Sequence, residues 1–388
     1  MYKENSKNNT YMKFVVSSTS LLTHLQAVGK VIGPKSTMPI LDCIVFDVTK
    51  KSIKLTASDL EITLTTKLEP ESVEHGGKIA IPARIILEII KKFPEQPLTF
   101  EVDKDSYSIR IMSSNGEYSL VGCDADEFPQ TESDADESSV KLKSNCGLVL
   151  DGISKTLFAT GNDEIRLVMN CILVELMNDS INFVASDAHK LVRYKRFDAK
   201  GDEENQSFIL PKKPASLLKQ ILPKKDDENI KIEFSSKKAQ FEFGTYKLSC
   251  KLIEGKFPNY NSVIPQNNPN KLIIDREMLL NSINRVSVVA NPASNQIKLE
   301  LSNNKIEISA QDIDFSTSGH EVLECQYEGA QMAIGFKSSF LSEIISNITS
   351  SNIIVELSDP VRPGLFLPYD NDNADEDVLM MLMPMMIN

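Results

Sequence analysis

The 388-residue sequence has no apolar run of the roughly 20 residues that a membrane-spanning helix needs. Its first residues, MYKENSKNNTYMKF, also lack the apolar stretch of a signal peptide. The six cysteines form no CxxC pair, the spacing common in redox and zinc motifs. We therefore expect a cytoplasmic protein whose cysteines are buried as small apolar side chains, with no disulfide and no metal site.

Motifs of catalysis are missing as well. The sequence has no Gly-rich phosphate loop and no nucleophile elbow. Asp187 and His189 stand close together, but no serine or cysteine recurs beside them, and Asp59 and Asp312 occupy similar contexts without a histidine. A recurrent Asp at a strand end is more often a turn or cap residue. The sequence thus favours a protein that is not an enzyme and needs no cofactor.

An excess of positive charge is also absent. The chain has 42 Lys and Arg against 54 Asp and Glu, a formal net charge of −12. Taken alone, this balance argues against a protein that grips the nucleic-acid backbone tightly. Hydrophobic content of 41% and charged content of 25% are those of a globular protein, and the length predicts two or three domains.

What the sequence does have is an internal repeat. The segment IKLTASDLEITL around Asp59 reappears as INFVASDAHKLVRY around Asp187 and as IEISAQDIDFST around Asp312, at steps of 128 and 125 residues. Two further markers keep a similar step: an extended segment that runs into an amphipathic helix, and a closing strand. The closing strands end in DADEFP, LIEGKFP and MMLMP. The chain is therefore predicted to hold three copies of one domain.

Each copy mixes helices and strands. The segment SSTSLLTHLQAVGKVI places Leu21, Leu25, Val28 and Ile32 on one helical stripe, and short alternating strands such as SIKLTA and KIEISA follow. This pattern is typical of an α+β domain. The predicted domains span 12–134, 140–262 and 263–388, after an extension over residues 1–11. The apolar end VLMMLMPMMIN is predicted to be the last strand of the third copy and a docking surface.

The three copies, the element ASDAHKL, and the segments STMPIL, LIEGKFPNY and MPMM together resemble the β sliding clamp family of bacterial DNA polymerase III. The resemblance covers roughly residues 12 to 388. It implies three tandem copies of a DNA-clamp domain in a ring-shaped head-to-tail dimer, with helices lining the inside and antiparallel sheets outside. It also implies a processivity factor that encircles duplex DNA, without base readout, and tethers the polymerase, the clamp loader and repair proteins.

A closed ring holds DNA by topology, so weak contacts suffice and a negative net charge is acceptable. The basic residues expected to face DNA lie on the polar sides of the predicted helices or in loops that match DNA-facing positions of the family. They are Lys35, Arg84, Lys91, Arg166, Lys213, Lys219, Arg276, Arg285 and Lys337. Glu88 and Glu343 lie on the same helices, so the expected positive field is modest.

The resemblance also implies two contact sites. At the dimer interface, Tyr118 and Leu120 would meet Val288 and Val289 of the other subunit. A hydrophobic pocket between copies two and three would take short linear peptides of partner proteins. Its residues would be Met169, Ser186, Ala188, His189, Lys190, Leu191, Pro258, Val263, Phe340, Val361, Pro363, Met381, Leu382, Met383, Pro384, Met385 and Met386.

The sequence departs from the commonest family pattern within this pocket. Ala188 and Lys190 stand where Gly and Arg are frequent, and Ser262 and Met386 replace common basic residues. The pocket is therefore expected to be less positive and more apolar. A three-domain scaffold that binds proteins but not DNA remains an alternative, which the clustering or scattering of the basic residues would decide.

Overall fold

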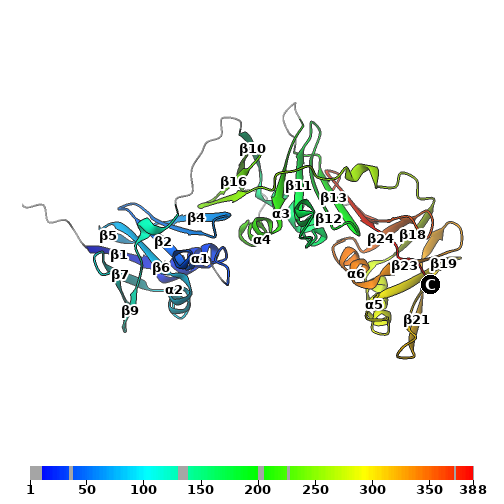
Figure 1. Cartoon of the computed structure of the whole chain (residues 1–388), viewed down its shortest axis with the longest axis horizontal. Coiled ribbons are helices and arrows are strands. Elements are labelled where there is room, and N and C mark those ends of the chain that lie inside the picture. The colour runs from blue at the N-terminus through cyan, green and yellow to red at the C-terminus, as the bar shows by residue number, and fades with distance from the viewer. Residues whose placement is uncertain are drawn as a thin grey trace, which may run out of the picture. The chain divides into compact units, whose positions relative to one another are not determined.

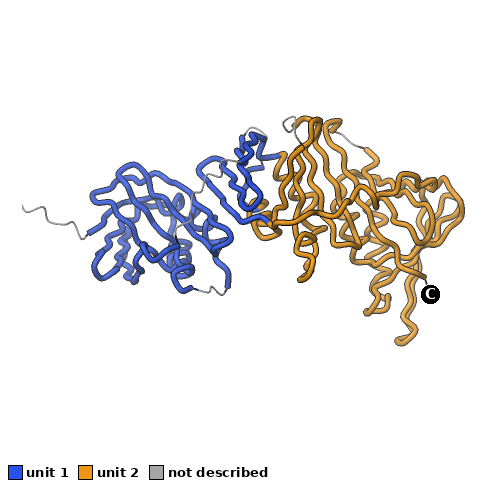
Figure 2. Tube along the Cα trace, turned by 45° about the horizontal axis from the view of Figure 1, so that its top comes forward, with its two compact units in different colours: residues 1–147, 220–252 blue, residues 148–219, 253–388 orange. Residues whose placement is uncertain are grey.

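The computed structural model describes residues 11–34, 38–129, 139–199, 205–224, 228–370 and 373–387. The chain forms two compact units, residues 1–147 with 220–252 and residues 148–219 with 253–388 (Figure 2). Lys35 and most of the predicted N-terminal extension lie outside the described residues.

The first unit holds two antiparallel sheets. One has five strands in the order β5-β1-β7-β8-β9, and the other has eight in the order β10-β15-β16-β17-β4-β3-β2-β6 (Figure 1). The strands are β1 (Tyr11–Ser17), β2 (Cys43–Val48), β3 (Ile53–Ser58), β4 (Ile62–Leu68), β5 (Ser72–His75), β6 (Gly77–Pro82), β7 (Pro97–Asp103), β8 (Ser108–Met112), β9 (Glu117–Val121), β10 (Val140–Asn145), β15 (Asn229–Phe234), β16 (Lys238–Phe243) and β17 (Tyr246–Lys251).

The second unit also holds two antiparallel sheets, with strand orders β14-β11-β12-β13-β26-β25-β24-β18-β22 and β21-β20-β19-β23. The strands are β11 (Cys171–Leu176), β12 (Ile181–Ser186), β13 (Lys190–Arg196), β14 (Gln206–Pro211), β18 (Asn270–Asp275), β19 (Gln296–Ser302), β20 (Lys305–Asp312), β21 (Thr317–Glu324), β22 (Gln326–Glu328), β23 (Met332–Lys337), β24 (Asn352–Leu357), β25 (Gly364–Pro368) and β26 (Glu376–Leu382).

Each predicted copy carries two α-helices in the described residues. They are α1 (Ser18–Gly29) and α2 (Ala83–Ile90), α3 (Cys146–Thr156) and α4 (Lys212–Ile221), and α5 (Arg276–Ser287) and α6 (Ser338–Ser346). Short 3₁₀ turns join several elements: η1 (Pro39–Asp42), η2 (Ala125–Glu127), η3 (Leu157–Ala159), η4 (Leu167–Asn170) and η5 (Tyr260–Ser262). The chain thus has the mixed α+β content that the sequence predicts.

The apolar stripe of α1 packs on the sheets as its spacing predicts. Leu21, Leu25 and Val28 have no exposed surface. Ser17 caps the helix, and its Oγ accepts a hydrogen bond from the Ser20 N–H at 3.2 Å. Ile32 was predicted on the same stripe, but the helix ends at Gly29 and Ile32 is only half-buried. The stripe is therefore one turn shorter than the sequence predicts.

The recurrent aspartates occupy one kind of turn in all three copies. Each Oδ1 accepts hydrogen bonds from two backbone N–H groups, two and three residues further on. For Asp187 the donors are His189 at 2.9 Å and Lys190 at 2.8 Å. The prediction that these are turn residues is confirmed, since the side chain closes the turn between two paired strands.

The sheets continue from one predicted copy into the next. In the first unit β4 pairs antiparallel with β17, and in the second β13 pairs antiparallel with β26. We call these pairings the first and second junctions. Because each junction joins strands of different copies through a hydrogen-bonded ladder, neighbouring copies share a continuous sheet.

Four of the cysteines are buried, and Cys123 and Cys325 are half-buried. Within the described ranges, no helix is long and apolar enough to cross a membrane. The same ranges hold no group of three or more His, Cys, Asp or Glu side chains arranged to bind a metal ion.

Candidate partner-docking site, DNA-facing residues and closing strands

The predicted docking residues all belong to the second unit, around the second junction. There Leu191 lies opposite Met381, and Lys190 lies opposite Leu382. Beneath this ladder is an apolar cluster that includes Leu191, Met381 and Leu365. An apolar layer under an accessible surface is what the docking of a short apolar peptide requires.

Large apolar side chains remain exposed beside the second junction. Val361 is 67% exposed, Val263 50%, Met386 81% and Met383 38%. The other predicted docking residues differ in exposure. Met169, Ser186, Leu191, Met381 and Leu382 are buried, Pro363, Phe340, Pro384 and Met385 are half-buried, and Ala188, His189 and Pro258 are exposed. The buried members support the surface, and the exposed members form it.

The chain end is held by hydrogen bonds to three neighbouring elements. The Met383 N–H donates to the His189 carbonyl at 2.8 Å, and the Met385 N–H donates to the Gly335 carbonyl at 2.8 Å. The Gln296 Nε2 donates to the Met386 carbonyl at 2.7 Å. These bonds hold the apolar terminal segment against the turn before β13, β23 and the start of β19.

Glycine is required where the chain end crosses β23. A Cβ on Gly335 would lie 2.7 Å from the Met385 carbonyl oxygen and 2.8 Å from Gln296 Nε2. No other residue type allows such a close backbone approach. Gly335 therefore fixes the course of the terminal segment.

The turn before β13 contains a strained residue. Ala188 has a φ of 74°, in the left-handed region that L-residues rarely adopt. The Ser186 Oγ accepts a hydrogen bond from the Ala188 N–H at 3.2 Å and donates to the Lys190 carbonyl at 2.9 Å. These bonds, with those of Asp187, hold the strained turn in place.

Lys190 is buried although it belongs to the predicted pocket. Only 4% of the surface of Lys190 is exposed. Its Nζ forms ion pairs with Asp187 Oδ2 at 3.4 Å and with the Glu343 carboxylate, and it lies 4.5 Å from the Phe340 ring centroid. The positive charge of Lys190 is therefore balanced by two carboxylates, and it joins the turn before β13 to α6.

His189 is a second polar residue of the predicted docking surface, next to Lys190 in the sequence. Its ring stacks on Phe340, with centroids 5.7 Å apart and an interplanar angle of 29°. His189 is exposed, so a bound peptide could reach it. Phe340 thus contacts both His189 and Lys190.

Sequence reasoning missed several residues under the docking surface. Phe257, Tyr260 and Ile264 are buried in the same cluster, and Val168 and Leu367 pack against it. The alternation in GLFLP carried a signal for Leu367. The loop residues carried none, because their burial depends on contacts with strands far away in the sequence.

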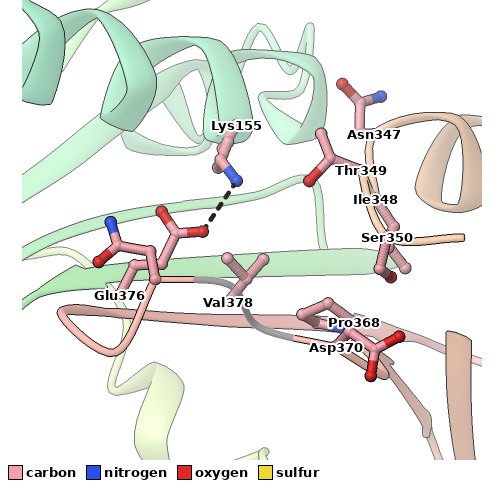
Figure 3. A pocket seen from close by; sticks show the side chains of 10 residues that line it. Lys155, Asn347, Ile348, Thr349, Ser350, Pro368, Asp370, Glu376 and Val378 are labelled. Atoms are coloured by element: carbon pink, nitrogen blue, oxygen red, sulfur yellow. Dashed lines mark ion pairs between the residues drawn. The ribbon is translucent and has the colours of Figure 1, made fainter. Parts of the chain in front are cut away.

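The second unit also contains a polar cavity of about 210 Å³ that the sequence did not predict (Figure 3). Its lining comes from the end of α3, the segment after α6 and the ends of β25 and β26. Within its lining, Lys155 Nζ lies 3.6 Å from Glu376 Oε1. The Tyr194 hydroxyl also donates to Glu376 Oε2 at 2.9 Å. None of the predicted docking residues lines this cavity.

The predicted DNA-facing residues are placed mostly on helices. Arg84 is on α2, and Lys91 is its C-cap; Lys213 and Lys219 are on α4, and Arg276 and Arg285 are on α5. Lys337 ends β23, and Arg166 precedes η4. All are exposed except the half-buried Arg276 and Lys337.

Several of these basic side chains are already paired with acids. Arg285 holds the Glu321 carboxylate through two hydrogen bonds of 2.6 Å, which raises the pKa of the guanidinium. Arg166 pairs with Asp163 at 2.8 Å, and Arg276 pairs with Glu277 at 3.2 Å. Such pairs reduce the positive field that these residues present.

The residues of the predicted dimer interface lie at two sheet edges. Tyr118 and Leu120 are on β9, the edge of the five-stranded sheet, and are 43% and 9% exposed. Val288, 82% exposed, and Val289 follow α5, close to the edge strand β21. The Thr317 Oγ1 on β21 donates to the Val289 carbonyl at 3.3 Å.

Comparison with protein families gives three matches in tandem. The model of the N-terminal domain of the DNA polymerase III beta subunit matches residues 12–132. The models of the central and C-terminal domains match residues 146–259 and 261–385. These matches confirm the predicted organisation as three tandem clamp domains.

Sliding clamps that match along almost their whole length support the same family. The beta sliding clamps of Staphylococcus epidermidis and Staphylococcus aureus are 28% and 27% identical over 380 residues, covering 95% of this chain and 98% of theirs. A DnaN sliding clamp from Pseudomonas aeruginosa bound to griselimycin has a TM-score of 0.91 at 25% identity. One from Bartonella birtlesii, also bound to griselimycin, has a TM-score of 0.89 at 28% identity. Both structures cover 97% of this chain and 100% of their own.

Proposed function

The chain belongs to the DNA polymerase III beta subunit family, the sliding clamps, and on that premise we propose how its residues close a ring, hold DNA and bind partners. A clamp is a processivity factor: it encircles duplex DNA and tethers the polymerase to it. The three consecutive family matches over residues 12–385 carry this conclusion. The clamp works without catalysis, in the cytoplasm, and needs no cofactor.

Ring closure follows from the strand pairings. β4 and β13 occupy equivalent places in copies one and two, and each pairs with the last strand of the next copy. The equivalent strand of copy three is β21, and the last strand of copy one is β9. Each lies at the edge of its sheet. A second copy of the chain would pair β21 with β9 at two interfaces, giving a closed head-to-tail dimer.

The register expected for β9 can be read from three equivalent rows of paired residues, one in each copy. Each starts from the residue four positions before the first helix of its copy and crosses the sheet to the last strand. The ladders are Phe14–Phe100–Ile111–Tyr118, Leu142–Ile232–Phe241–Leu248 and Leu272–Val355–Phe366–Met380. Tyr118 is therefore the counterpart of Leu248 and Met380.

The register of β21 follows in the same way from the other side. The ladders Val45–Thr56–Thr65, Leu173–Val184–Arg193 and Lys298–Ser309–His320 each start at the third residue of a strand. His320 is therefore the counterpart of Thr65 and Arg193. At the two junctions inside the chain, the residue before these counterparts, Leu64 or Val192, lies opposite Leu248 or Met380. By this equivalence, Gly319 lies opposite Tyr118 of the partner subunit.

The proposed pairing suits the local packing. A Cβ on Gly319 would lie 3.0 Å from Val289 Cγ2. Because glycine has no side chain, Val289 remains uncovered there and forms an apolar floor beside β21. The Tyr118 ring is 43% exposed and could cover this floor. An aromatic side chain placed over a cross-strand glycine shields the backbone and buries apolar area. This accounts for Tyr118 and Val289 as members of one interface.

DNA is held by enclosure, with weak contacts from the basic residues named above. Arg84, Lys91 and Lys219 make no ion pair within the described part of the chain and would contribute most. Contacts to phosphates alone carry no sequence information. The clamp would therefore slide on any duplex.

Partner proteins would dock short linear peptides on the surface formed by Val263, Val361, Met383 and Met386 with the buried cluster beneath. Because Lys190 is neutralised by Asp187 and Glu343, apolar burial supplies most of the binding energy. We propose that polymerase, clamp loader and repair proteins share this surface. Griselimycin, bound in the two related structures, is a suitable probe, and we propose that it binds here.

Cross-linking tests the ring. The register predicts Ser119 opposite Ser318 of the partner subunit, so the double variant Ser119→Cys and Ser318→Cys should form covalent dimers under mild oxidation, because facing Cβ atoms lie within disulfide reach. A matched control, Ser119→Cys with Glu321→Cys, is displaced by three residues and should not cross-link. Equal cross-linking of both pairs, or of neither in a dimeric protein, would refute the register.

A further inference from the structure

The hairpin between β20 and β21 differs from its counterparts in the other copies. Ser58 pairs with Thr63 and Ser186 pairs with Leu191, whereas Gln311, the equivalent residue of copy three, pairs with Ser318. The turn of copy three is therefore two residues longer. The extra residues enlarge a tip that spans residues 313–316.

The longer tip is apolar and exposed. Ile313 is 80% exposed and Phe315 is 75% exposed. At the equivalent turn of copy one, Leu60 is 43% exposed, and copy two has the small Ala188. Two large apolar side chains on a two-residue extension are costly in water, so a contact that covers them would be favourable.

The proposed closing register places this tip beside another exposed apolar residue. If Tyr118 lies opposite Gly319, then Leu120 lies opposite Thr317, and Val121 lies opposite Ser316. Val121 is 66% exposed at the end of β9. The tip of one subunit would therefore meet the segment at Val121 of the other.

We propose that the tip carrying Ile313 and Phe315 packs against the Val121 segment of the partner subunit and forms an apolar clasp at each ring interface. The two junctions inside the chain have no such clasp, since their turns are shorter. This inference rests on the proposed ring closure. It adds to it a contact that has no counterpart at the two junctions inside the chain.

The clasp has to be apolar in nature. Asp314 lies in the tip, and Asp124 follows the Val121 segment, so charge works against the contact. Asp124 is also engaged within its own subunit, where it accepts a hydrogen bond from the Tyr107 hydroxyl at 3.0 Å. Added salt should therefore leave the contribution of the clasp unchanged or increase it.

Sedimentation equilibrium of the full chain tests the clasp. The double variant Ile313→Ser and Phe315→Ser should raise the dimer Kd by roughly 10- to 100-fold, the effect of leaving two large apolar side chains without cover. Its far-UV circular dichroism spectrum should match that of the wild type, because both side chains are already exposed in the single chain and the fold does not depend on them. The matched control Leu60→Ser, at the first junction, should leave the dimer Kd unchanged.

A double-mutant cycle separates contact from indirect effects. Val121→Ser alone should weaken the dimer, and its combination with Phe315→Ser should weaken it by less than the sum of the two. A monomeric wild type would overturn the proposed ring itself. A dimeric wild type with an unchanged Kd in the double serine variant, or strict additivity in the cycle, would overturn the clasp alone.

Discussion

At the first junction Leu64 lies opposite Leu248, and at the second Val192 lies opposite Met380. The strand register is the same, but the surroundings differ. β17 carries the exposed Lys247 and Lys251, whereas β26 runs on into the methionines of the chain end. The comparison teaches that the repeat supplies the same strand pairing twice, and that different side chains set the second junction, our proposed docking surface, apart from the first.

The turns at the two junctions sharpen this contrast. Leu60 and Ala188 occupy equivalent positions with φ values of 76° and 74°. Along β4 at the first junction, His24 Nδ1 lies 2.8 Å from Thr66 Oγ1, and burial lowers the pKa of His24. Behind the second turn is the ion-paired Lys190. One backbone conformation thus serves a neutral polar junction and a charged one.

The largest effect is expected where a third junction would form between subunits. Leu120 is the counterpart of Cys250 and Leu382, and replacing it with Asp would place a charge in the closing ladder. Sedimentation velocity should show monomers for Leu120→Asp and for Tyr118→Asp, whose side chain is exposed in the single chain. The control Asn115→Asp, in the turn before β9, should stay dimeric. Persisting dimers in both interface variants would place the interface elsewhere.

The next largest effect concerns the docking surface. Deleting Met383 to Asn388 should weaken griselimycin binding by roughly 100-fold or more, because the segment supplies the exposed Met383 and Met386 to the proposed surface. The dimer should remain, since the deletion is remote from β9 and β21 in sequence and pairing. Leu60→Ser, at the first junction, is the control and should bind normally. Isothermal titration gives both affinities, and unchanged affinity after the deletion would contradict the assignment.

A smaller effect is expected from the buried ion pair of the second junction. Lys190→Met should lower the free energy of unfolding by about 1–2 kcal/mol, because it leaves the Asp187 carboxylate without its ion pair while the half-exposed Glu343 can rehydrate. Lys247→Met removes an exposed pair with Glu242 at the first junction and should change it by less than about 0.5 kcal/mol. Urea unfolding measures both, and equal effects would show that burial does not distinguish the pairs.

The strained turns should respond alike at the two junctions. Ala188→Gly and Leu60→Gly each relieve a left-handed conformation, which costs roughly 1 kcal/mol for an L-residue. Greater freedom of the unfolded glycine chain offsets part of the gain, so we expect stabilisation of a few tenths of a kcal/mol in each. Destabilisation by either variant in thermal unfolding would argue that the side chain at that turn contributes packing.

The smallest effect concerns pH. Hydrogen bonding to Arg285 lowers the pKa of Glu321 on β21 below the usual 4.5. A carboxylate with a depressed folded-state pKa stabilises the native state above pH 4.5, and the stabilisation is lost as the pH falls through its folded value. Glu321→Gln should therefore lower the free energy of unfolding slightly near pH 7 and make it fall less steeply below pH 4.5. An unaltered acid profile in unfolding experiments would show that the pair contributes nothing.

Much of the fold could be predicted from the sequence because its signals are local and repeated. The stripe of Leu21, Leu25 and Val28 predicted α1, and the recurrent aspartates predicted the turns. The pairing of β4 with β17 could not be predicted, because it joins strands about 180 positions apart through backbone bonds that no side-chain pattern records. The burial of Lys190 was also hidden, since it depends on Glu343 and Phe340 from the next copy.

Retention on DNA tests the central claim most directly. After loading onto nicked circular DNA, the protein should remain bound in salt that screens phosphate contacts, and should be lost once a single cut makes the DNA linear. This result is predicted by a ring that encloses its substrate. Equal loss from circular and linear DNA at the same salt concentration would contradict it.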